Sequence, residues 1–587
     1  MQRPEIDQTE HDVELKFPRA NIIAVEAISR VLASSLGPAS RDKLVVRQLE
    51  TREDSSAAPS FDDYVATSDG ATILDKLPLG HPIGRLVGGI LGPEQTDEET
   101  VEGAEIRDGV STTVVLLAAM LSEAESLIER GVHPYTVCAG YMRGLDVALR
   151  TIDEETRELS LPPKAHSAEW HVARTALTGN DVGGFAERWA EAAVEVVETI
   201  GMPDEVTMAV RATRTGSIAD SRVIHGAVLD RNKLCHSEMP TRVTDAKVLV
   251  LSGYDSGGGL QDPDTKKIRV ETDDPETIAG IDEPLVARRR AVVETLVAAG
   301  VDVVVARQGI IPAYQQLLVD NGIVGIRGVN RIDLQQVALA TGAALVQDIT
   351  DVSEDDLGRA GVVEEVTGDS RPGSKRTRRM VVFDGCSDPN SVCIQLHGVS
   401  GQLAEQATTM LRQAAAAVAT AKGYGGAQPG IVPGGGAVDV RIAQRLRHAA
   451  RSEGSRVGLA MEAFADAAEE VPATLARNAG LDALTTVANA KTKQDSEGST
   501  AGLILPQGTI GDVLDAGVVD PTANRKQIYV TATELAVLVL RVDDAIDAEF
   551  TETAPDPDDA IYDDVAEQQQ DHLKRNPDSH RFDELSD

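Results

Sequence analysis

Apolar residues recur at helical spacing over much of the chain. Residues 112–130, 135–159 and 182–200 place aliphatic side chains three or four positions apart, as do the alanine-rich residues from about 401 to 480. The same spacing near the N-terminus begins after Asn21, which could cap a helix. That helix is carried by Ile22, Val25, Ile28, Val31, Leu32 and Leu36. Both ends of the chain are therefore predicted to be mainly helical.

The pattern changes in the middle of the chain. Short runs rich in valine and other aliphatic residues occupy 245–251, 301–306 and 343–349. Helical patterns at 283–299 and 331–341 separate these runs. Strands that alternate with helices predict an α/β module between the two helical parts.

Polar and glycine-rich stretches interrupt these elements. Residues 252–267 and 367–379 are polar and predict exposed loops, and the glycine-rich residues 423–440 break the alanine-rich helices. Residues 551–587 are acidic, contain three consecutive glutamines and are predicted to be disordered.

The composition limits the classes of function. The 587 residues suffice for about three or four domains, and 42% of them are hydrophobic. A formal net charge of −38 would repel nucleic acid, so no nucleic-acid partner is expected. Such a surface fits either a salt-rich cytoplasm or an acidic protein whose charge serves solubility. The sequence shows no signal-peptide pattern and no run of 18 apolar residues, which predicts a cytoplasmic protein without a membrane partner.

The four cysteines are Cys138, Cys235, Cys386 and Cys393, which are far apart and form no CxxC pair. Neither a disulfide framework nor a zinc site is indicated. Most of the cysteines are expected to be buried and to fill apolar space.

One stretch combines the residue types that bind phosphate. Asp108 and Gly109 are followed by Val110, Ser111 and Thr112, directly in front of a predicted apolar helix. A bound phosphate needs converging backbone N–H groups, little side-chain obstruction and often a metal ion held by a carboxylate. This stretch supplies a carboxylate, a glycine and hydroxyls, although the same residues also make an ordinary helix cap.

Three further segments could approach an anionic ligand. Asp69 and Gly70 offer a carboxylate at the turn of a short strand or hairpin predicted over 63–77. Gly37-Pro38 ends the first helix and could expose backbone amides, and Gly434–Gly436 would allow close backbone approach. The plain alternatives are a hairpin turn, a helix stop and a hinge, so no single motif decides the function.

Eight segments match, in order, the motifs of one family. They read "NIIAVEAISRVLASSLGPASRDKL", "SDGATILDKLPLGHP", "DGVSTTVVLL", "GVHPYTVCAGY", "NGIVGIRGVNRIDLQQVALATGA", "VPGGGAV", "NAGLD" and "TATELAVLVLRVDDAI". Over most of residues 20–548 the chain resembles the group II chaperonins, the archaeal thermosome and its eukaryotic cytosolic relatives. The resemblance implies a multidomain α+β chaperonin fold. Its parts would be a mainly helical equatorial domain, a small α/β intermediate domain and an α/β apical domain with a helical protrusion.

The resemblance also implies a division of the chain. The equatorial domain would comprise 1–151 and 402–550, the intermediate domain 152–222 and 370–401, the apical domain 223–369, and the acidic tail 551–587. Subunits of this family form two back-to-back rings around a cavity, bind ATP with Mg and assist the folding of other proteins. The implied partners are homologous subunits, in a homo- or hetero-oligomeric double ring, and unfolded client proteins.

Residues 274–296 match the apical protrusion of the family and the helix after it. Ile278, Ile281 and Leu285 are the implied apolar contacts to clients. An ordinary amphipathic surface helix would show the same pattern.

The nucleotide site of the family maps onto matching positions of this sequence. Gly37 and Pro38 match the first phosphate-contacting turn, Asp69 and Gly70 the second, Asp108 the Mg-binding aspartate, and Gly109, Val110, Ser111 and Thr112 the phosphate loop. Gly435 matches the glycine run at the nucleoside, and Gly480 and Asp520 match positions near the base and the ribose. The resemblance therefore implies ATP and Mg as cofactors and Asp69 as a catalytic carboxylate.

Several positions depart from the family pattern. Ala39 and Ser40 replace the lysine and glycine of the first turn, and Val110 replaces one hydroxyl of the phosphate loop. Asn180 stands where a lysine often lies near the terminal phosphate, and an acidic insertion lies within 92–106. The lost cations predict weaker contacts to the phosphates.

The largest departure lies in residues 397–421. Aligned with the family helix, this stretch places Gln413 where the family has the aspartate that positions the attacking water. Glutamine can hydrogen-bond to water but cannot accept its proton. Glu405 lies eight residues earlier, about 12 Å along a helix axis, and is too distant to substitute.

Two hypotheses follow from these residues. The first is a thermosome-like chaperonin subunit that binds ATP, with slow or absent hydrolysis. The second is a catalytically degenerate scaffold or regulatory subunit derived from a chaperonin. An unrelated metabolic enzyme has little support, because the sequence shows no constellation of His, Cys and Ser typical of a nucleophile.

Overall fold

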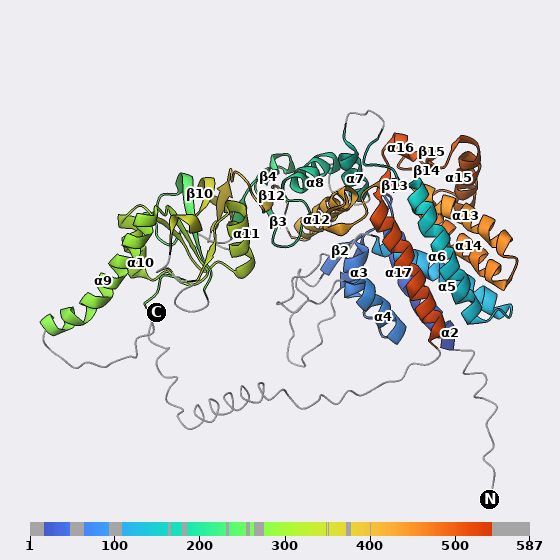
Figure 1. The fold of residues 1–587 in the computed structure, drawn as a ribbon, viewed down its shortest axis with the longest axis horizontal. Coiled ribbons are helices and arrows are strands. Elements are labelled where there is room, and N and C mark those ends of the chain that lie inside the picture. Colours follow the sequence, from blue (N-terminus) through green and yellow to red (C-terminus); the bar gives the residue numbers. More distant parts are fainter. Residues whose placement is uncertain are drawn as a thin grey trace, which may run out of the picture. The chain divides into compact units, whose positions relative to one another are not determined.

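The computed structural model describes residues 17–46, 64–92, 109–161, 166–178, 185–230, 234–253, 259–262, 275–347, 349, 352–370, 377–399 and 401–542. Helices from both ends of the sequence pack together (Figure 1). These helices are α2 (Phe17–Leu32), α3 (Gly70–Lys76), α4 (Pro82–Leu91), α5 (Val110–Glu129), α6 (Pro134–Glu155), α13 (Ala437–Glu453), α14 (Arg456–Asn478), α15 (Ala483–Glu497) and α17 (Thr522–Arg541). The predicted mainly helical character of the two ends is confirmed.

Small side chains let the central helices approach closely. Helix α14 packs on α5, α6 and α13. A β-carbon on Gly140 of α6 would lie 2.3 Å from Ala460 Cβ of α14, and one on Gly144 would lie 2.5 Å from Phe464 Cδ1. Tyr141 lies between these glycines, and its hydroxyl donates a hydrogen bond to the carbonyl of Met120. Glycine and alanine therefore bring α6 and α14 together.

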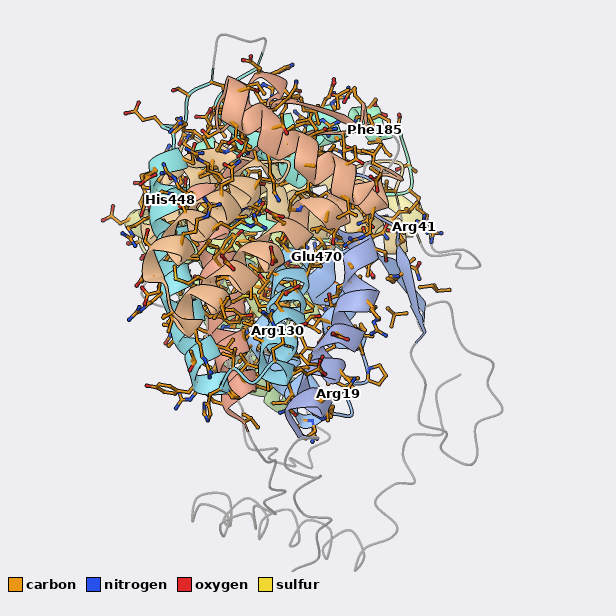
Figure 2. All side chains as sticks on the ribbon, turned by 90° about the vertical axis from the view of Figure 1, so that its right-hand side faces the viewer. Arg19, Arg41, Arg130, Phe185, His448 and Glu470 are labelled. Atoms are coloured by element: carbon orange, nitrogen blue, oxygen red, sulfur yellow. The ribbon has the colours of Figure 1, made fainter. Side chains whose placement is uncertain are left out.

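More than half of the residues of helix α5 are buried in this bundle, where the helix packs on α2, α14 and α17. Among the described residues it is the one helix long and apolar enough to cross a membrane. Core helices of soluble proteins have the same composition, and this helix lies inside a bundle. Figure 2 shows polar side chains, among them Arg19, Arg130 and His448, around the outside of the bundle.

Three two-stranded sheets and two short helical turns complete the helical part. The hairpins are β1 (Lys43–Val46) with β2 (Tyr64–Thr67) and β14 (Ala501–Ile504) with β15 (Thr509–Asp512). Strands β13 (Ile431–Pro433) and β16 (Val519–Pro521) pair antiparallel, and the turns are η1 (Ala33–Ser35) and α16 (Val513–Ala516). The β13–β16 pair joins segments that lie almost ninety residues apart in the sequence.

A three-stranded sheet with helices forms the next part. Strand β12 (Val392–Leu396) lies between β3 (Met208–Ala212), which is parallel to it, and β4 (Arg222–Ile224), which is antiparallel. Helices α7 (Ala168–Ala176), α8 (Ala186–Ile200) and α12 (Gln402–Lys422) pack on one another beside it. Their apolar residues share one core with those of the sheet.

The middle of the chain forms a seven-stranded sheet. Its order is β5 (Ala227–Asp230), β11 (Thr377–Asp384), β10 (Gly358–Ser370), β6 (Arg242–Leu251), β7 (Val303–Ala306) and β8 (Val324–Ile326), with β9 (Leu345–Val346) also paired to β6. Strands β6, β7, β8 and β9 are parallel, as expected for strands joined by helices. These helices are α9 (Pro275–Ala299), α10 (Pro312–Asp320) and α11 (Arg331–Thr341). The predicted α/β module is confirmed.

Some local predictions differ from the structure. Helix α2 begins at Phe17, so Asn21 is a buried residue inside the helix and the predicted cap there is wrong. The family resemblance ends the implied apical domain at residue 369. The seven-stranded sheet continues beyond this residue, because β11 pairs with both β10 and β5. Strand β4 pairs with β12 and not with this sheet. The predicted tail 551–587 lies outside the described residues.

Candidate functional site

The first turns of α3 and α5 are in direct contact. A β-carbon on Gly70, the first residue of α3, would lie 2.3 Å from Ser111 Oγ and 3.0 Å from Ser111 N. Only glycine at position 70 leaves room for this approach. Two of the predicted phosphate-contacting segments therefore meet in the structure.

Helix α5 begins where the sequence predicts a phosphate loop. Gly109 precedes its first turn with a φ of 96°, a left-handed conformation that favours glycine. Val110, Ser111 and Thr112 then form the first turn, where backbone N–H groups have no acceptor within the helix. The positive end of the helix dipole lies here, so the turn can bind an anion. Asp108 lies outside the described residues.

The first predicted turn is held against the same place. Ser35 Oγ donates to the carbonyl of Leu32 (2.6 Å) and lies 3.3 Å from Ser111 Oγ, a contact in which either hydroxyl can be the donor. Gly37 follows with a φ of 81°, and Pro38 comes next. The contact between the two serines places the end of the first helical segment beside the start of α5.

Asn478 fixes this turn from the other side. Its side-chain amide donates to the carbonyls of Ala33 (2.8 Å) and Leu36 (2.7 Å), which ties this turn to the end of α14. Asn478 is the last residue of α14, and Gly480 follows it with a φ of 75° and open space around its α-carbon. Sequence reasoning assigned no role to Asn478, although it is the first residue of the matched motif "NAGLD".

Asp69 is the N-cap residue of α3. Its Oδ2 accepts hydrogen bonds from Thr72 N (2.8 Å) and Thr72 Oγ1 (2.6 Å). Its backbone N–H donates to Thr67 Oγ1 at 3.0 Å. The predicted hairpin turn at Asp69 and Gly70 is wrong, because β2 ends at Thr67 and a helix begins at Gly70.

Gln413 reaches Asp69 from α12. Gln413 Nε2 donates to Asp69 Oδ1 at 2.6 Å, so both carboxylate oxygens of Asp69 accept hydrogen bonds. Glu405 is exposed in the first turn of the same helix and makes no such contact. The side chain that faces Asp69 is therefore an amide, which can donate a hydrogen bond but carries no negative charge.

The residues predicted near the nucleoside come together through β13 and β16. Asp520 pairs with Val432, and the glycine run follows directly after β13. Gly435 has a φ of 58°, and a β-carbon on it would lie 2.4 Å from the carbonyl oxygen of Leu503. The glycine run and Asp520 are thus neighbours, whereas no hydrogen bond among the described residues links Gly480 to Asp520.

Several predicted residues lie outside the described part of the chain. They are Asp108, Asn180, most of the acidic insertion at 92–106, and the side chains of Ile278 and Ile281. Leu285 is partly buried on α9. Among the residues that the structure describes, no group of three His, Cys, Asp or Glu side chains could hold a metal ion.

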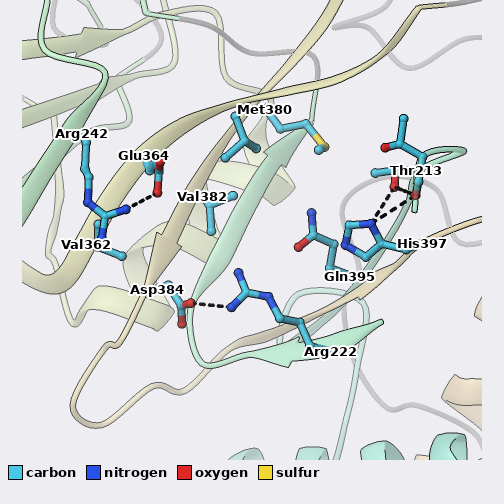
Figure 3. A pocket seen from close by; sticks show the side chains of 12 residues that line it. Thr213, Arg222, Arg242, Val362, Glu364, Met380, Val382, Asp384, Gln395 and His397 are labelled. Carbon is cyan, nitrogen blue, oxygen red and sulfur yellow. Dashed lines mark hydrogen bonds and ion pairs between the residues drawn. The ribbon is translucent and has the colours of Figure 1, made fainter. Parts of the chain in front are cut away.

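A separate cavity of about 460 Å³ lies where the seven-stranded sheet meets the three-stranded sheet (Figure 3). Arg222 and Arg242 line it and are paired with acids: Arg222 with Asp384 at 3.4 Å, and Arg242 with Glu364 at 2.5 Å. None of the predicted nucleotide-site residues lines this cavity. Its charges are balanced within the chain, so it gives no indication of a ligand.

Comparison with known proteins identifies the class. The model of the TCP-1/cpn60 chaperonin family matches residues 28–549, and this chain belongs to that family. It is a group II chaperonin, a class of proteins that takes part in protein folding, and proteins of the thermosome family use ATP. The α+β chaperonin fold implied by the sequence motifs is thereby confirmed.

Three similar proteins carry thermosome names. A thermosome subunit of Methanopyrus kandleri is 32% identical over 540 residues, covering 90% of this chain and 92% of the relative. Thermosome subunit alpha of Aeropyrum pernix is 33% identical over 540 residues, with 90% of each chain covered. Thermosome subunit beta of Archaeoglobus fulgidus is 32% identical over 555 residues, covering 93% and 94%. Each name describes a subunit, which is a part of an assembly.

Proposed function

We propose that this chain is an ATP-binding subunit of a thermosome-like double ring, with a nucleotide site that binds ATP but hydrolyses it slowly. The observation that carries the proposal is the hydrogen bond from Gln413 to Asp69. It puts an uncharged amide beside the carboxylate that the family resemblance assigns to catalysis.

The binding half of the proposal rests on converging segments. The turn at Gly37 and Pro38, the start of α3 and the start of α5 are joined by the contacts of Ser111 with Ser35 and Gly70. The free N–H groups of α5 and its serine and threonine hydroxyls suit phosphate oxygens. The glycine run and Asp520 would take the nucleoside.

The same donor set fits a phosphate-bound magnesium ion. Mg prefers one or two carboxylates together with phosphate oxygens, and Asp108 stands two positions before the first residue of α5 in the sequence. Asp108 would hold the ion, which would offset negative charge on the phosphates when bound. Asp69 is less suited to direct coordination, because both of its oxygens already accept hydrogen bonds.

Slow hydrolysis follows from the chemistry of residue 413. A general base close to the attacking water contributes about 10²–10⁴-fold to rate. Gln413 can orient a water through its amide, as glutamines do in some nucleotide hydrolases, but cannot take its proton. Asp69 is the remaining carboxylate that could accept the proton of the attacking water.

The assembly and the surroundings complete the proposal. The subunits would form a homo- or hetero-oligomeric ring with equatorial, intermediate and apical domains, and unfolded proteins would be the clients. The net charge of −38 favours a salt-rich cytoplasm. A hetero-oligomer would let more active subunits drive the cycle of a slow one.

The alternative is a scaffold or regulatory subunit with no turnover at all. Calorimetric titration of ATP in molar KCl, with and without Mg, and steady-state phosphate release by the same sample separate the two. We expect ATP binding that requires Mg and weakens in Asp108→Asn, rings by electron microscopy, and turnover well below that of a thermosome. Rapid phosphate release would contradict the proposal, and absent ATP binding would favour the scaffold.

A further inference from the structure

One arginine connects the two elements that carry the proposed nucleoside site. Arg525 lies in the first turn of α17, and only 9% of its side chain is exposed. Its Nη2 donates to Asp520 Oδ2, and its Nη1 lies 3.3 Å from Asp439 Oδ2. Each Nη atom thus contacts a different acid, so the guanidinium bridges Asp439 and Asp520.

The two acids come from different parts of the site. Asp439 is in the first turn of α13, three residues after the last glycine of the Gly434–Gly436 run. Asp520 is in β16, where it pairs with Val432 in the strand before that run. Through Arg525, the glycine run and Asp520 are held by side chains as well as by the strand pair.

Asp439 is the buried anchor of this bridge. None of its side chain is exposed, and Tyr529 donates a hydrogen bond to its Oδ1 at 2.8 Å. Burial raises the pKa of the Asp439 carboxyl, and the charge of Arg525 opposes that shift. Because a buried ionic group must be paired, Arg525 has little freedom to leave Asp439.

Asp520 differs from Asp439 because one of its carboxylate oxygens can accept a hydrogen bond from a ligand. Its side chain is 26% exposed, and its Oδ1 accepts no hydrogen bond from the described residues. An ionised carboxylate oxygen is a strong acceptor for a hydroxyl donor. The sugar of a nucleotide carries two such vicinal hydroxyls, whereas the phosphate chain carries none.

We propose that Arg525 is a positioning residue that holds Oδ2 of Asp520 so that its Oδ1 faces the ribose hydroxyls of bound ATP, with Asp439 as the fixed anchor. This inference rests on the proposed function. It predicts that the preference of the protein for ribose over deoxygenated sugars depends on Arg525. It also separates this contact from phosphate binding, which the start of α5 would supply.

The test compares three ligands on the full-length chain: ATP, 2′,3′-dideoxy-ATP and inorganic tripolyphosphate. Arg525→Lys keeps the charge, but a single ammonium group cannot bridge both acids in the same geometry. We expect ATP affinity to fall about tenfold, with dideoxy-ATP and tripolyphosphate changed less than about twofold. A merely structural role would weaken all three ligands together.

The control is Arg447→Lys. Arg447 lies on α13 and bridges Asp466 and Glu469 of α14, so it is the same kind of ion-pair bridge away from the predicted site residues. Its substitution should leave the preference for ATP over dideoxy-ATP unchanged. Thermal unfolding of both variants reports whether they are folded.

A second variant, Asp439→Asn, tests the inference if Arg525→Lys does not fold. Asp439→Asn retains a side chain of the same shape and leaves Arg525 paired with Asp520. It should reduce the preference for ATP over dideoxy-ATP by about threefold, because the anchor is weaker. An unchanged preference in the folded variants, or a wild type that binds both nucleotides equally, would overturn the inference while ATP binding stands. A wild type that does not bind ATP would overturn the proposed function and the inference with it.

Discussion

Gln413 Nε2 donates a hydrogen bond to Asp69 Oδ1 at 2.6 Å, across 344 residues of sequence. The contact joins α12 to the cap of α3, and Thr72 occupies the other carboxylate oxygen. Asp69 is thus held in one orientation by donors on both oxygens. An amide satisfies Asp69 at no electrostatic cost, whereas a second carboxylate at position 413 would repel it.

That repulsion is the basis for the first prediction. Gln413→Asp would place a second carboxylate opposite Asp69, a few ångströms away because its side chain is one methylene shorter, and like charges this close raise the pKa of one of them. A carboxylate with a raised pKa is a better general base near neutral pH. We expect steady-state phosphate release to rise at least about tenfold, with a pH profile that shifts upward relative to the wild type.

The matched control for this prediction is Gln527→Asp. Gln527 is exposed on α17 and bonds only to Thr531 one turn away. The substitution makes the same chemical change at a side chain that is bonded to a threonine hydroxyl and not to a carboxylate, so turnover should stay at the wild-type level. Equal rates in Gln413→Asp and wild type would show that residue 413 does not limit hydrolysis.

Much of this arrangement could be predicted from the sequence. Helical spacing and β-branched runs locate elements such as α5 and β6, because local patterns report which face is buried. The alignment with the family helix places Gln413 in the site, and the structure puts it against Asp69. These predictions depend on residues close together in sequence or on the family resemblance.

Other parts could not be predicted from the sequence. Asp69-Gly70 is typical of a hairpin turn, but in the structure Asp69 caps α3 and Gly70, the first residue of that helix, packs against Ser111. Asn478 and Arg525 act on partners that only the folded chain brings near: Asn478 bonds to Leu36, 442 residues away. Single-sequence patterns carry no signal for such pairs.

The second prediction concerns the contact between α3 and α5. Gly70→Ala would place a methyl group 2.3 Å from Ser111 Oγ, so one helix must shift. Such overpacking costs about 1–3 kcal/mol. We expect a lower free energy of unfolding and an ATP affinity about tenfold weaker, measured by denaturant titration and calorimetry.

Gly89→Ala serves as the comparison for this prediction. Gly89 lies on the exposed side of α4, and a β-carbon there would meet no atom within 4 Å. Alanine is the better helix former by about 1 kcal/mol, so this variant should be slightly more stable and bind ATP normally. Unchanged ATP affinity in Gly70→Ala would count against the role of the α3–α5 contact in binding.

The third prediction uses the cysteines. Cys138, Cys386 and Cys393 are buried, as the sequence predicts, and Cys235 is partly buried. Burial raises the pKa of Cys235 to about 11 and that of Cys386 and of Cys393 to about 12. The reactive form of a thiol is the thiolate, so at pH 8 these groups are protonated and inert.

Titration with an aromatic disulfide reagent checks this expectation. In the native protein at pH 8 we expect reaction at least about 100-fold slower than for a free thiol, with rates that still rise between pH 8 and pH 10. Unfolding in guanidinium should release all four thiols of the sequence at once. A single fast thiol in the native protein would contradict the assigned burial.

The fourth prediction concerns salt. With a net charge of −38, mutual repulsion of acidic side chains opposes folding at low ionic strength. The Debye length falls from about 10 Å at 0.1 M to about 3 Å at 1 M salt, which screens that repulsion. Screening also weakens exposed ion pairs such as Arg242–Glu364, but such pairs each contribute only about 0–1 kcal/mol.

The reduction of net repulsion should therefore outweigh the weakening of exposed ion pairs. We expect the Tm of the full-length chain to rise by at least about 5 °C between 0.1 M and 2 M KCl. In a domain of about 150–250 residues, a Tm shift of about 2–4 °C corresponds to 1 kcal/mol of stability. Sucrose at matched osmolality is the control, because it is excluded from the surface but does not screen charge. An equal rise in sucrose would assign the effect to solvent exclusion. A Tm that falls with KCl would mean that the loss of ion pairs outweighs the screening of repulsion. That result would contradict the hypothesis that the protein is suited to a salt-rich cytoplasm.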